Sequence, residues 1–292
     1  MTQTTNVHFN KVLIIGVGLI GGSLGLALKK AKMADRILGV GRSKSNLDEA
    51  LQLGAIDEVV SLAQGAAQAD LIVVCVPVAQ TEEILKQIKP YLKPDAIVTD
   101  VGSTKMDVIM AAKNALLDDV IQFVPAHPIA GSAKHGASAS QVDLYVNRQV
   151  IICPLQENNT QRVEAIEAMW RGVGANLFKM SAVQHDAVFA AVSHLPHVLS
   201  YALMLQVANA EDAPTKFRHA GAGFRDFTRI AASSPEMWRD ICLANKSAVL
   251  KEIDQYLNVV KHLQTLIQEG NGEQLEKLFS KASESRNNWE LG

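Results

Sequence analysis

Residues 12–28 read VLIIGVGLIGGSLGLAL, and this stretch decides the fold. A run of aliphatic and β-branched residues breaks into glycines and continues as an apolar helix, a pattern typical of a nucleotide-binding strand–turn–helix unit. Gly16, Gly18 and Gly21 fit the spacing G-x-G-x-x-G. The first glycine permits a tight turn, the second lets the backbone approach a pyrophosphate, and the third lets the helix pack on the strand. The sequence therefore predicts a dinucleotide site, with a purely structural turn as the alternative.

The composition is that of a globular chain without strong charge. Its 292 residues are 48% hydrophobic, and 28 basic against 30 acidic side chains leave a net charge of −2. No overall field draws such a chain to nucleic acid or to an anionic membrane, and we expect neither partner. The three cysteines form no C-x-x-C pair of the zinc or redox kind. The polar start MTQTTNVHFN and the lack of an uninterrupted apolar run of about 18 residues predict a cytoplasmic protein.

Short β-branched runs recur between helical segments as far as residue 180. They are RILGVG (36–41), LIVVCVP (71–77), AIVTDVG (96–102), IQFVPAHP (121–128), QVIICP (149–154) and a candidate last strand, ANLFKM (175–180), after a helix over 160–171. Strands that alternate with helices predict a parallel sheet covered on both faces. We therefore predict a Rossmann-type α/β dinucleotide-binding domain over residues 1–180.

From Ser181 onward helical periodicity replaces the strands, and we place the domain boundary there. A helix is expected from about Val183, with Pro196 kinking or breaking it. Residues 181–292 are predicted to form an all-helical substrate-binding and dimerisation domain. Packing of its apolar face against its own chain is the alternative. The final residues, NNWELG, lead us to expect no fused catalytic or regulatory domain.

A second long helix is predicted near the C-terminus. Ser233 and Glu236 have the spacing of a capping box, and Pro235 suits the first turn. The apolar stripe that follows predicts a helix as far as about Glu269. Its predicted stop is the run Gly270, Asn271 and Gly272.

The second strand indicates which dinucleotide binds. In the NAD form of this fold, an Asp or Glu near the end of that strand binds the ribose hydroxyls, whereas a nearby Arg accommodates the 2′-phosphate of NADP. Here the strand ends as GVGRS, with Arg42 and Ser43 in place of a carboxylate. We therefore favour NADP over NAD, with Asp48 or Glu49 reaching back as the alternative. The expected cofactor contacts are Gly16, Gly18, Leu19, Ile20, Gly21, Arg42, Ser43, Val76, Pro77 and Ser103.

Two further segments reach the carboxyl edge of the predicted sheet, where ligands of such folds bind. Ser103, in VGSTK, is expected to contact cofactor or substrate, and the alternative is that it caps the next helix. His127 lies between Pro125 and Pro128 and is expected in a fixed loop over the same edge. A histidine there is suited to proton transfer near neutral pH, and we expect a general base.

The helical part supplies five more candidates, which are Ser193, His194, His197, Arg225 and Arg229. The two histidines are three residues apart, but no third ligand has suitable spacing and we expect no metal. The two arginines are four apart and offer planar charged groups that hold carboxylates through paired hydrogen bonds. Pairing with local acids such as Asp226 and Asp240 is the alternative.

The segments GVGLIGGS, DVGSTK, HPIAGS, SHLPH and GFRDFTR follow one another in an order that resembles the bacterial prephenate and arogenate (cyclohexadienyl) dehydrogenases of tyrosine biosynthesis. The resemblance runs from Gly16 to Arg229, through both predicted domains. It implies a homodimer formed through the helical domain. It also implies NAD(P)-dependent oxidative decarboxylation of a cyclohexadienol.

The resemblance also implies residue roles. His127 would accept the proton of the ring hydroxyl, Ser103 would hydrogen-bond that hydroxyl or His127, and Arg229 would hold the ring carboxylate. The surrounding pocket would contain Ser193, His194, His197 and Arg225.

One position departs from the family pattern. Many relatives carry an acid two places after the glycine of HPIAG, where this chain has Ala133, followed by Lys134 and His135. Loss of that acid favours the anionic keto acid prephenate over the amino acid arogenate, with dual use left open.

Two alternatives are other classes of protein. The first is a β-hydroxyacid dehydrogenase or imine reductase of similar architecture, for which Lys216 and Lys246 would be the candidate lysines. The second is a non-enzymatic, NADP-sensing dimer.

Overall fold

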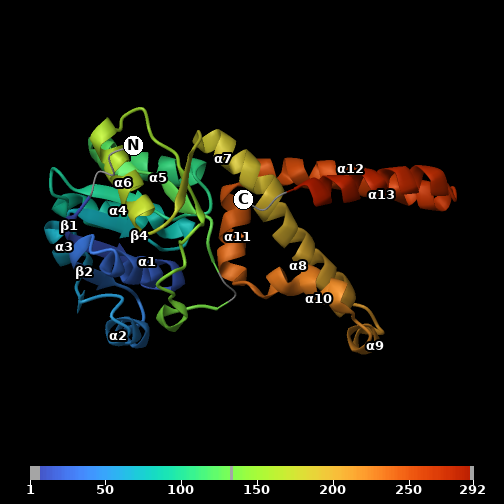
Figure 1. Cartoon of the computed structure of the whole chain (residues 1–292), viewed down its shortest axis with the longest axis horizontal. Helices are drawn as coiled ribbons and strands as arrows, with labels where there is room; N and C mark the ends of the chain where they lie inside the picture. The colour runs from blue at the N-terminus through green and yellow to red at the C-terminus, as the bar shows by residue number, and fades with distance from the viewer. Residues whose placement is uncertain (1–6, 132–133, 290–292) are drawn as a thin grey trace. The chain divides into compact units, whose positions relative to one another are not determined.

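The computed structural model describes residues 7–131 and 134–289. These residues belong to two compact units, Met1–Asn245 and Lys246–Gly292, which are considered separately below. The first unit contains a six-stranded parallel sheet in the order β3-β2-β1-β4-β5-β6 (Figure 1). Its strands are β1 (Phe9–Ile15), β2 (Ala34–Val40), β3 (Glu58–Val59), β4 (Leu71–Val74), β5 (Ile97–Asp100) and β6 (Phe123–Val124). This strand order confirms the predicted Rossmann-type domain.

Both faces of the sheet are buried, because successive side chains of a strand point to opposite sides. In β1, Val12 and Ile14 join one core and Leu13 and Ile15 the other. The first core is covered by α1 (Leu19–Lys30), α2 (Lys44–Gln52) and α6 (Thr160–Gly172), and the second by α3 (Leu62–Gln68), α4 (Thr81–Ile88) and α5 (Met106–Leu116). Short 3₁₀ turns complete this part at η1 (Val78–Gln80), η2 (Lys89–Tyr91), η3 (Leu117–Gln122) and η4 (Ala137–Ala139).

A second sheet replaces the predicted continuation of the first. It has the order β7-β8-β9, formed by β7 (Ala126–Pro128), β8 (Gln149–Ile152) and β9 (Asn176–Lys179). The run IQFVPAHP is therefore two strands rather than one, separated by Pro125, which has no N–H to continue a ladder. The prediction that His127 lies in a loop is wrong, because it pairs with Ile151 on the edge strand β7.

One long helical run follows the second sheet (Figure 1). It consists of α7 (Ala182–Phe189), a π-helical turn η5 (Ala190–His194) and α8 (Leu195–Ala208). The break expected at Pro196 is replaced by that π turn, because its wider hydrogen bonding accommodates the missing N–H and the ring of a proline within a helix. The first unit ends with α9 (Ala213–Arg218), α10 (Ala222–Thr228), η6 (Arg229–Ala232) and α11 (Pro235–Ala244).

Within the described residues, one helical run meets the length and apolarity of a membrane span by composition alone. It is Ala182–Ala208, with a mean hydropathy of 1.5, and 28% of its most apolar stretch is buried in the chain. Polar side chains of this run are nevertheless buried against the nucleotide-binding part, since Asp186 accepts the backbone N–H of Lys105 at 2.8 Å. The run therefore packs on the nucleotide-binding part through some of its side chains, and most of its apolar stretch is not buried.

The helix predicted from Ser233 to about Glu269 differs from the observed structure in two respects. Ser234 rather than Ser233 is the N-cap, and its hydroxyl accepts the backbone N–H of Met237 at 3.4 Å. The helix also ends at Ala244, where Asn245 turns its side chain to Asp186 and His194. The prediction of one helix to Glu269 was therefore wrong.

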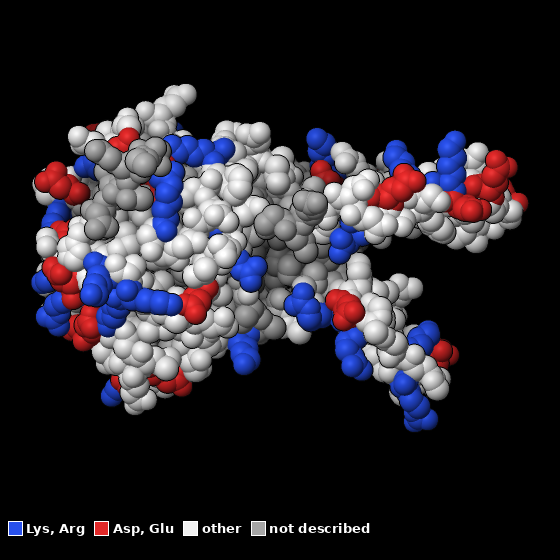
Figure 2. Space-filling model, viewed as in Figure 1, with Lys and Arg blue, Asp and Glu red and all other residues white. Residues whose placement is uncertain are grey.

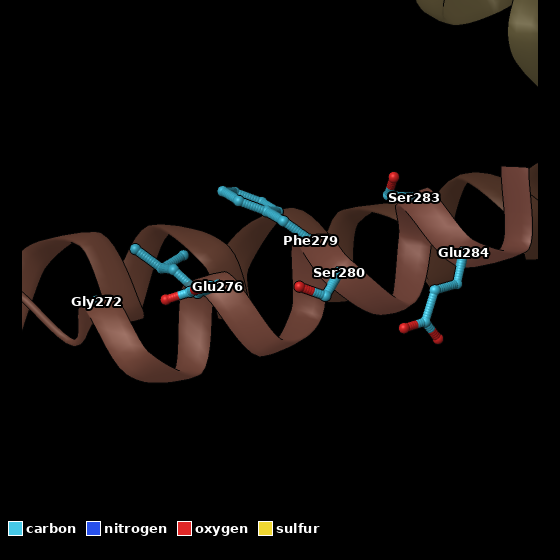
Figure 3. A pocket seen from close by; sticks show the side chains of 7 residues that line it. Gly272, Glu276, Phe279, Ser280, Ser283 and Glu284 are labelled. Atoms are coloured by element: carbon cyan, nitrogen blue, oxygen red, sulfur yellow. The ribbon is translucent and has the colours of Figure 1, made fainter. Parts of the chain in front are cut away.

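The second unit is a pair of helices, α12 (Lys246–Gln268) and α13 (Gly272–Asn288). The predicted stop is confirmed, since Gly270 has a φ of +67° in the turn between them. Asn271 caps α13, which the sequence reading did not anticipate. Along α13 lies a hollow of about 720 Å³ that is lined by this helix alone, including Phe279, which is 56% exposed (Figure 3).

Charges on the surface are mixed. Basic and acidic side chains alternate over the face shown in Figure 2, without a large patch of one sign on that face. An anionic ligand must therefore be met by a small number of local cations.

Helix α1 packs so closely on the first core that a methyl group added at Gly25 should destabilise the fold. A Cβ at Gly25 would lie 2.1 Å from the carbonyl oxygen of Ala55. We expect Gly25→Ala to lower the unfolding free energy by about 1–3 kcal/mol, because this backbone clash outweighs the better helix propensity of alanine. Gly272→Ala is the matched control, since nothing lies within 4 Å of its Cβ. Melting midpoints of the two variants test this, and equal midpoints would contradict it.

Candidate active site

The glycine turn has the shape of a dinucleotide cradle. Gly16 has a φ of +96°, and a Cβ there would lie 2.5 Å from the carbonyl oxygen of Cys75. A Cβ at Gly21 would lie 2.4 Å from the carbonyl oxygen of Gly16, so helix α1 packs directly on its own turn. Gly18 caps α1, and nothing lies within 4 Å of its Cβ position. The space above this helix N-terminus is therefore open for a pyrophosphate.

A cavity of about 490 Å³ adjoins this turn at the carboxyl ends of β1, β2 and β4. Among the predicted cofactor residues, those that line it are Gly16, Gly18, Arg42, Ser43, Val76 and Pro77. Those that do not line it are Leu19, Ile20, Gly21 and Ser103. The residues present thus fit an extended dinucleotide along the glycine turn and the end of β2.

Sequence reasoning missed Asn46 in this cavity. Its amide Nδ2 donates to the carbonyl of Val17 at 2.5 Å, and its Oδ1 accepts the N–H of Ala137 at 2.7 Å. Asn46 therefore fixes the glycine turn against the segment around η4. Its position three residues after the α2 cap Ser43 gave no signal of this role.

The end of β2 presents a cation. Arg42 is exposed at the cavity, and Ser43 caps α2 by accepting the N–H of Asn46 at 3.3 Å. Asp48 and Glu49 are exposed on α2 and do not line the cavity.

His127 belongs to a buried chain of hydrogen bonds. Its Nδ1 lies 2.8 Å from Nε2 of His185, and Nδ1 of His185 lies 2.8 Å from Oδ1 of Asp186. Asp186 also accepts the backbone N–H groups of Lys105 and Met106, at 2.8 and 2.9 Å. Asp186 on α7 thus satisfies the first N–H groups of α5, and the predicted alternative that Ser103 caps this helix is wrong, since the N-cap is Lys105.

The histidines of this site are neutral near pH 7. Burial, followed by the charges of His185, Lys105 and His194, holds the pKa of His127 well below its ordinary value. Burial likewise lowers the pKa of His194 to about 4. A neutral imidazole can accept a proton, so the state of His127 suits a base.

A fully buried ion pair stands beside these histidines. The ammonium of Lys105 and the carboxylate of Asp100 are bonded, with side chains 0% and 2% exposed. Asp100 also accepts the N–H of Gly102 at 2.8 Å and of Ala126 at 3.1 Å. The segment carrying Ser103 is thereby tied to the start of β7. Within the described residues no hydrogen bond joins the Ser103 hydroxyl to His127, whose Nδ1 is bonded to His185.

The predicted helical candidates lie close to a residue that the sequence reading missed. The ring of His197 stacks on Trp238, with centroids 3.5 Å apart, and its Nδ1 donates to the carbonyl of Ser193 at 2.9 Å. His194 lies 3.2 Å from the amide nitrogen of Asn245. No group of three or more potential metal ligands occurs in the described residues.

Among the described residues, Arg225 and Arg229 are not taken up by the local acids. Both are exposed, and in the described part of the chain neither forms an ion pair with Asp226 or Asp240, the latter being bound by Arg239 at 2.7 Å. Burial, and then the charge of Arg229, lowers the pKa of His197. The guanidinium of Arg229 is therefore close enough to His197 to affect its charge state. Ala133 lies outside the described residues.

An open cradle for a dinucleotide and a buried neutral histidine on β7 of the second sheet define a nicotinamide-dependent dehydrogenase. Residues 24–179 match the nucleotide-binding domain of prephenate dehydrogenase, and residues 181–281 match its dimerization domain. The chain belongs to the prephenate dehydrogenase family. It is an oxidoreductase of tyrosine biosynthesis, which excludes the other dehydrogenase classes and the sensing module considered above.

Relatives with known names agree with this assignment. Prephenate dehydrogenase of Bacillus subtilis is 37% identical over 278 residues, covering 94% of this chain and 75% of that protein. Cyclohexadienyl dehydrogenase of Zymomonas mobilis is 35% identical over 281 residues, covering 95% of both. The crystal structure of prephenate dehydrogenase from Aquifex aeolicus, in complex with hydroxyphenyl propionate and NAD⁺, has a TM-score of 0.88 at 35% identity, covering 95% of this chain and 97% of that one.

Proposed function

We propose that this chain oxidatively decarboxylates prephenate in preference to arogenate, with His127 as the general base and NADP as the favoured cofactor. The observation that carries the proposal is the buried neutral His127 on strand β7, whose Nδ1 is hydrogen-bonded to His185. Among residues 7–131 and 134–289 no hydrogen bond engages its Nε2, which we assign to the substrate hydroxyl. Ala133, in place of an acid, supports the anionic keto acid as substrate.

The residues divide the reaction between them. His127 accepts the hydroxyl proton as a carbonyl develops at that ring carbon, and returns it to the oxygen when the ring becomes aromatic. When bound, the nicotinamide supplies the acceptor for the hydride that leaves the same carbon. The carboxylate leaves as CO2, and the electrons of its broken C–C bond complete the aromatic ring. No net proton is released.

Substrate contacts are assigned to the helical part and to Ser103 of the nucleotide-binding part. Arg229 holds the ring carboxylate until it leaves, and Ser103 donates to the ring hydroxyl or to His127. The pocket around the substrate contains Ser193, His194, His197 and Arg225. We keep the boundary between nucleotide-binding and helical domains at Ser181, supported by the change from strands to helices at that point.

A homodimer through the helical domain is part of the proposal. It is supported by the match of residues 181–281 to a dimerization domain and by exposed apolar side chains on three helices, such as Leu205, Ile267 and Phe279. Light scattering should give twice the chain mass of 31.6 kDa, and a monomer would contradict this. A cytoplasmic location without membrane or nucleic-acid partners stays a prediction.

The direct test of the function is an assay of the purified enzyme that crosses prephenate and arogenate with NAD and NADP. We expect the highest kcat/KM for prephenate with NADP. Negligible rates in all four combinations would remove the proposed activity, whereas a preference for arogenate would remove only the substrate assignment.

Arg42 is expected to recognise the 2′-phosphate. Arg42→Ala should raise KM for NADP about 10- to 150-fold, because a hydrogen bond to a charged group contributes about 1.5–3 kcal/mol, and should change KM for NAD little. Arg36→Ala is the control, since Arg36 is exposed on β2, the strand that precedes Arg42, and pairs with Glu58 at 2.9 Å instead of lining the cavity. Equal effects on both cofactors would contradict the NADP assignment.

The pH profile tests His127. Because its pKa is lowered, the neutral base persists into acid, and kcat/KM should fall only with a midpoint well below about 6.5. His127→Asn should lower kcat about 10²- to 10⁴-fold and retain cofactor binding. The fall of kcat/KM at acid pH, the acid limb of the profile, should be absent from this variant. Circular dichroism at each pH shows whether the chain stays folded. A variant with wild-type kcat would show that His127 is not the base.

Arg229 is expected to bind the ring carboxylate. Arg229→Ala should raise KM for prephenate about 10- to 150-fold through loss of a charge-assisted contact. Arg218→Ala, at the exposed end of α9, is the matched control. An unchanged KM in Arg229→Ala would place the substrate carboxylate elsewhere.

A further inference from the structure

We propose that His185 and Asp186 are positioning residues that fix which ring nitrogen of His127 is the base and balance the charge that His127 carries while it holds the proton. This inference rests on the proposed function of His127. The carrying observation is the continuous chain from His127 Nδ1 to His185 and on to Asp186, with both links at 2.8 Å. All three side chains are at least 90% buried.

The chain of hydrogen bonds determines the tautomers. An ionised carboxylate only accepts, so the Nδ1 of His185 that faces Asp186 carries a hydrogen. In a neutral His185 the Nε2 is then a bare acceptor, and Nδ1 of His127 must donate to it. The remaining nitrogen of His127, Nε2, is left unprotonated, which is the form that a base requires.

Asp186 is held in place and in its charged form. Burial raises its pKa, but the hydrogen bonds from His185 and from the backbone N–H groups of Met106 and Lys105 outweigh this and leave the pKa below its ordinary value. Its carboxylate also caps α5, the helix that begins just after Ser103. One side chain therefore orients the histidine pair relative to the segment that carries Ser103.

The charges around His127 make a counter-charge necessary. Three groups act on His127 directly: His185 from α7, Lys105 at the start of α5 and His194 from η5. Asp186 on α7 and Asp100 at the end of β5 act on His185, and the Cys153 thiol after β8 lies beside Lys105 and the same two carboxylates. Asp100 is already engaged by Lys105. Asp186, acting through His185, is the carboxylate that remains to stabilise a protonated His127.

The test uses full-length enzyme and separates positioning from a purely structural role. His185→Leu removes the acceptor, so kcat should fall at least about 100-fold while KM and the dissociation constant for the cofactor change less than about threefold. His185→Gln can still accept from His127 through its amide oxygen, although it cannot share the positive charge. The kcat of His185→Gln should be at least about tenfold higher than that of His185→Leu, and still lower than that of the wild type.

The pH profile supplies a second readout. Asp186→Asn keeps an oxygen for His185 but removes the negative charge that favours the protonated pair. The acid limb of kcat/KM should therefore move to lower pH. Asp118→Asn is the matched control, a carboxyl-to-amide change at an exposed position of η3, and it should leave the limb in place.

The outcomes distinguish the two proposals. Wild-type kcat in both His185 variants, equal losses in both, or an unmoved acid limb in Asp186→Asn would overturn the positioning role. If His185→Leu does not fold, His185→Gln and the acid limb decide, and wild-type kcat in His185→Gln overturns the inference. Wild-type kcat in His127→Asn would instead overturn the proposed role of His127 as the base, on which this inference rests.

Discussion

The buried ion pair between Asp100 and Lys105 is the interaction on which the site depends. A carboxylate and an ammonium withdrawn from water are costly unless further hydrogen bonds satisfy them. Here the backbone supplies these bonds, since Gly102 and Ala126 both donate to Asp100. The pair therefore holds together the end of β5, the segment carrying Ser103 and the beginning of β7. The position of His127 on β7 follows from this arrangement.

The sequence was sufficient to predict the features that depend on local backbone geometry. The glycine turn, the strands β1, β2, β4 and β5 and the turn at Gly270 were all anticipated, because positive φ angles and β-branched runs are properties of short segments. The split of IQFVPAHP could not be read locally, since it depends on whether residues 126–128 pair with β5 or with β8. Ser234 replaced Ser233 for a similar reason, because adjacent serines are equivalent caps until the helix is positioned by its packing.

The candidate site residues also divide into those that local sequence predicts and those that depend on distant contacts. Of the residues predicted to contact the cofactor, Gly16 and Gly18 on the glycine turn and Arg42 and Ser43 after β2 line one cavity, as expected at the carboxyl ends of neighbouring parallel strands, whereas Leu19, Ile20 and Gly21 do not. His185, Asn46 and Trp238 were missed because their partners lie far away in sequence: His185 contacts His127 across 58 positions and Asn46 contacts Ala137 across 91. A His–Asp pair at the start of a helix resembles ordinary polar surface until its neighbours are known. The structure identifies it as buried.

Burial of several neutral histidines also makes the fold sensitive to proton uptake. His127, His185, His194 and His197 all have pKa values lowered by burial. In the unfolded chain these rings titrate near about 6.5, so below that pH the unfolded state binds protons that the folded state excludes. The stability contributed by the neutral rings is complete above the unfolded pKa and is lost as the pH falls toward the folded values. The burial that keeps these imidazoles neutral in mild acid thus limits the acid tolerance of the fold.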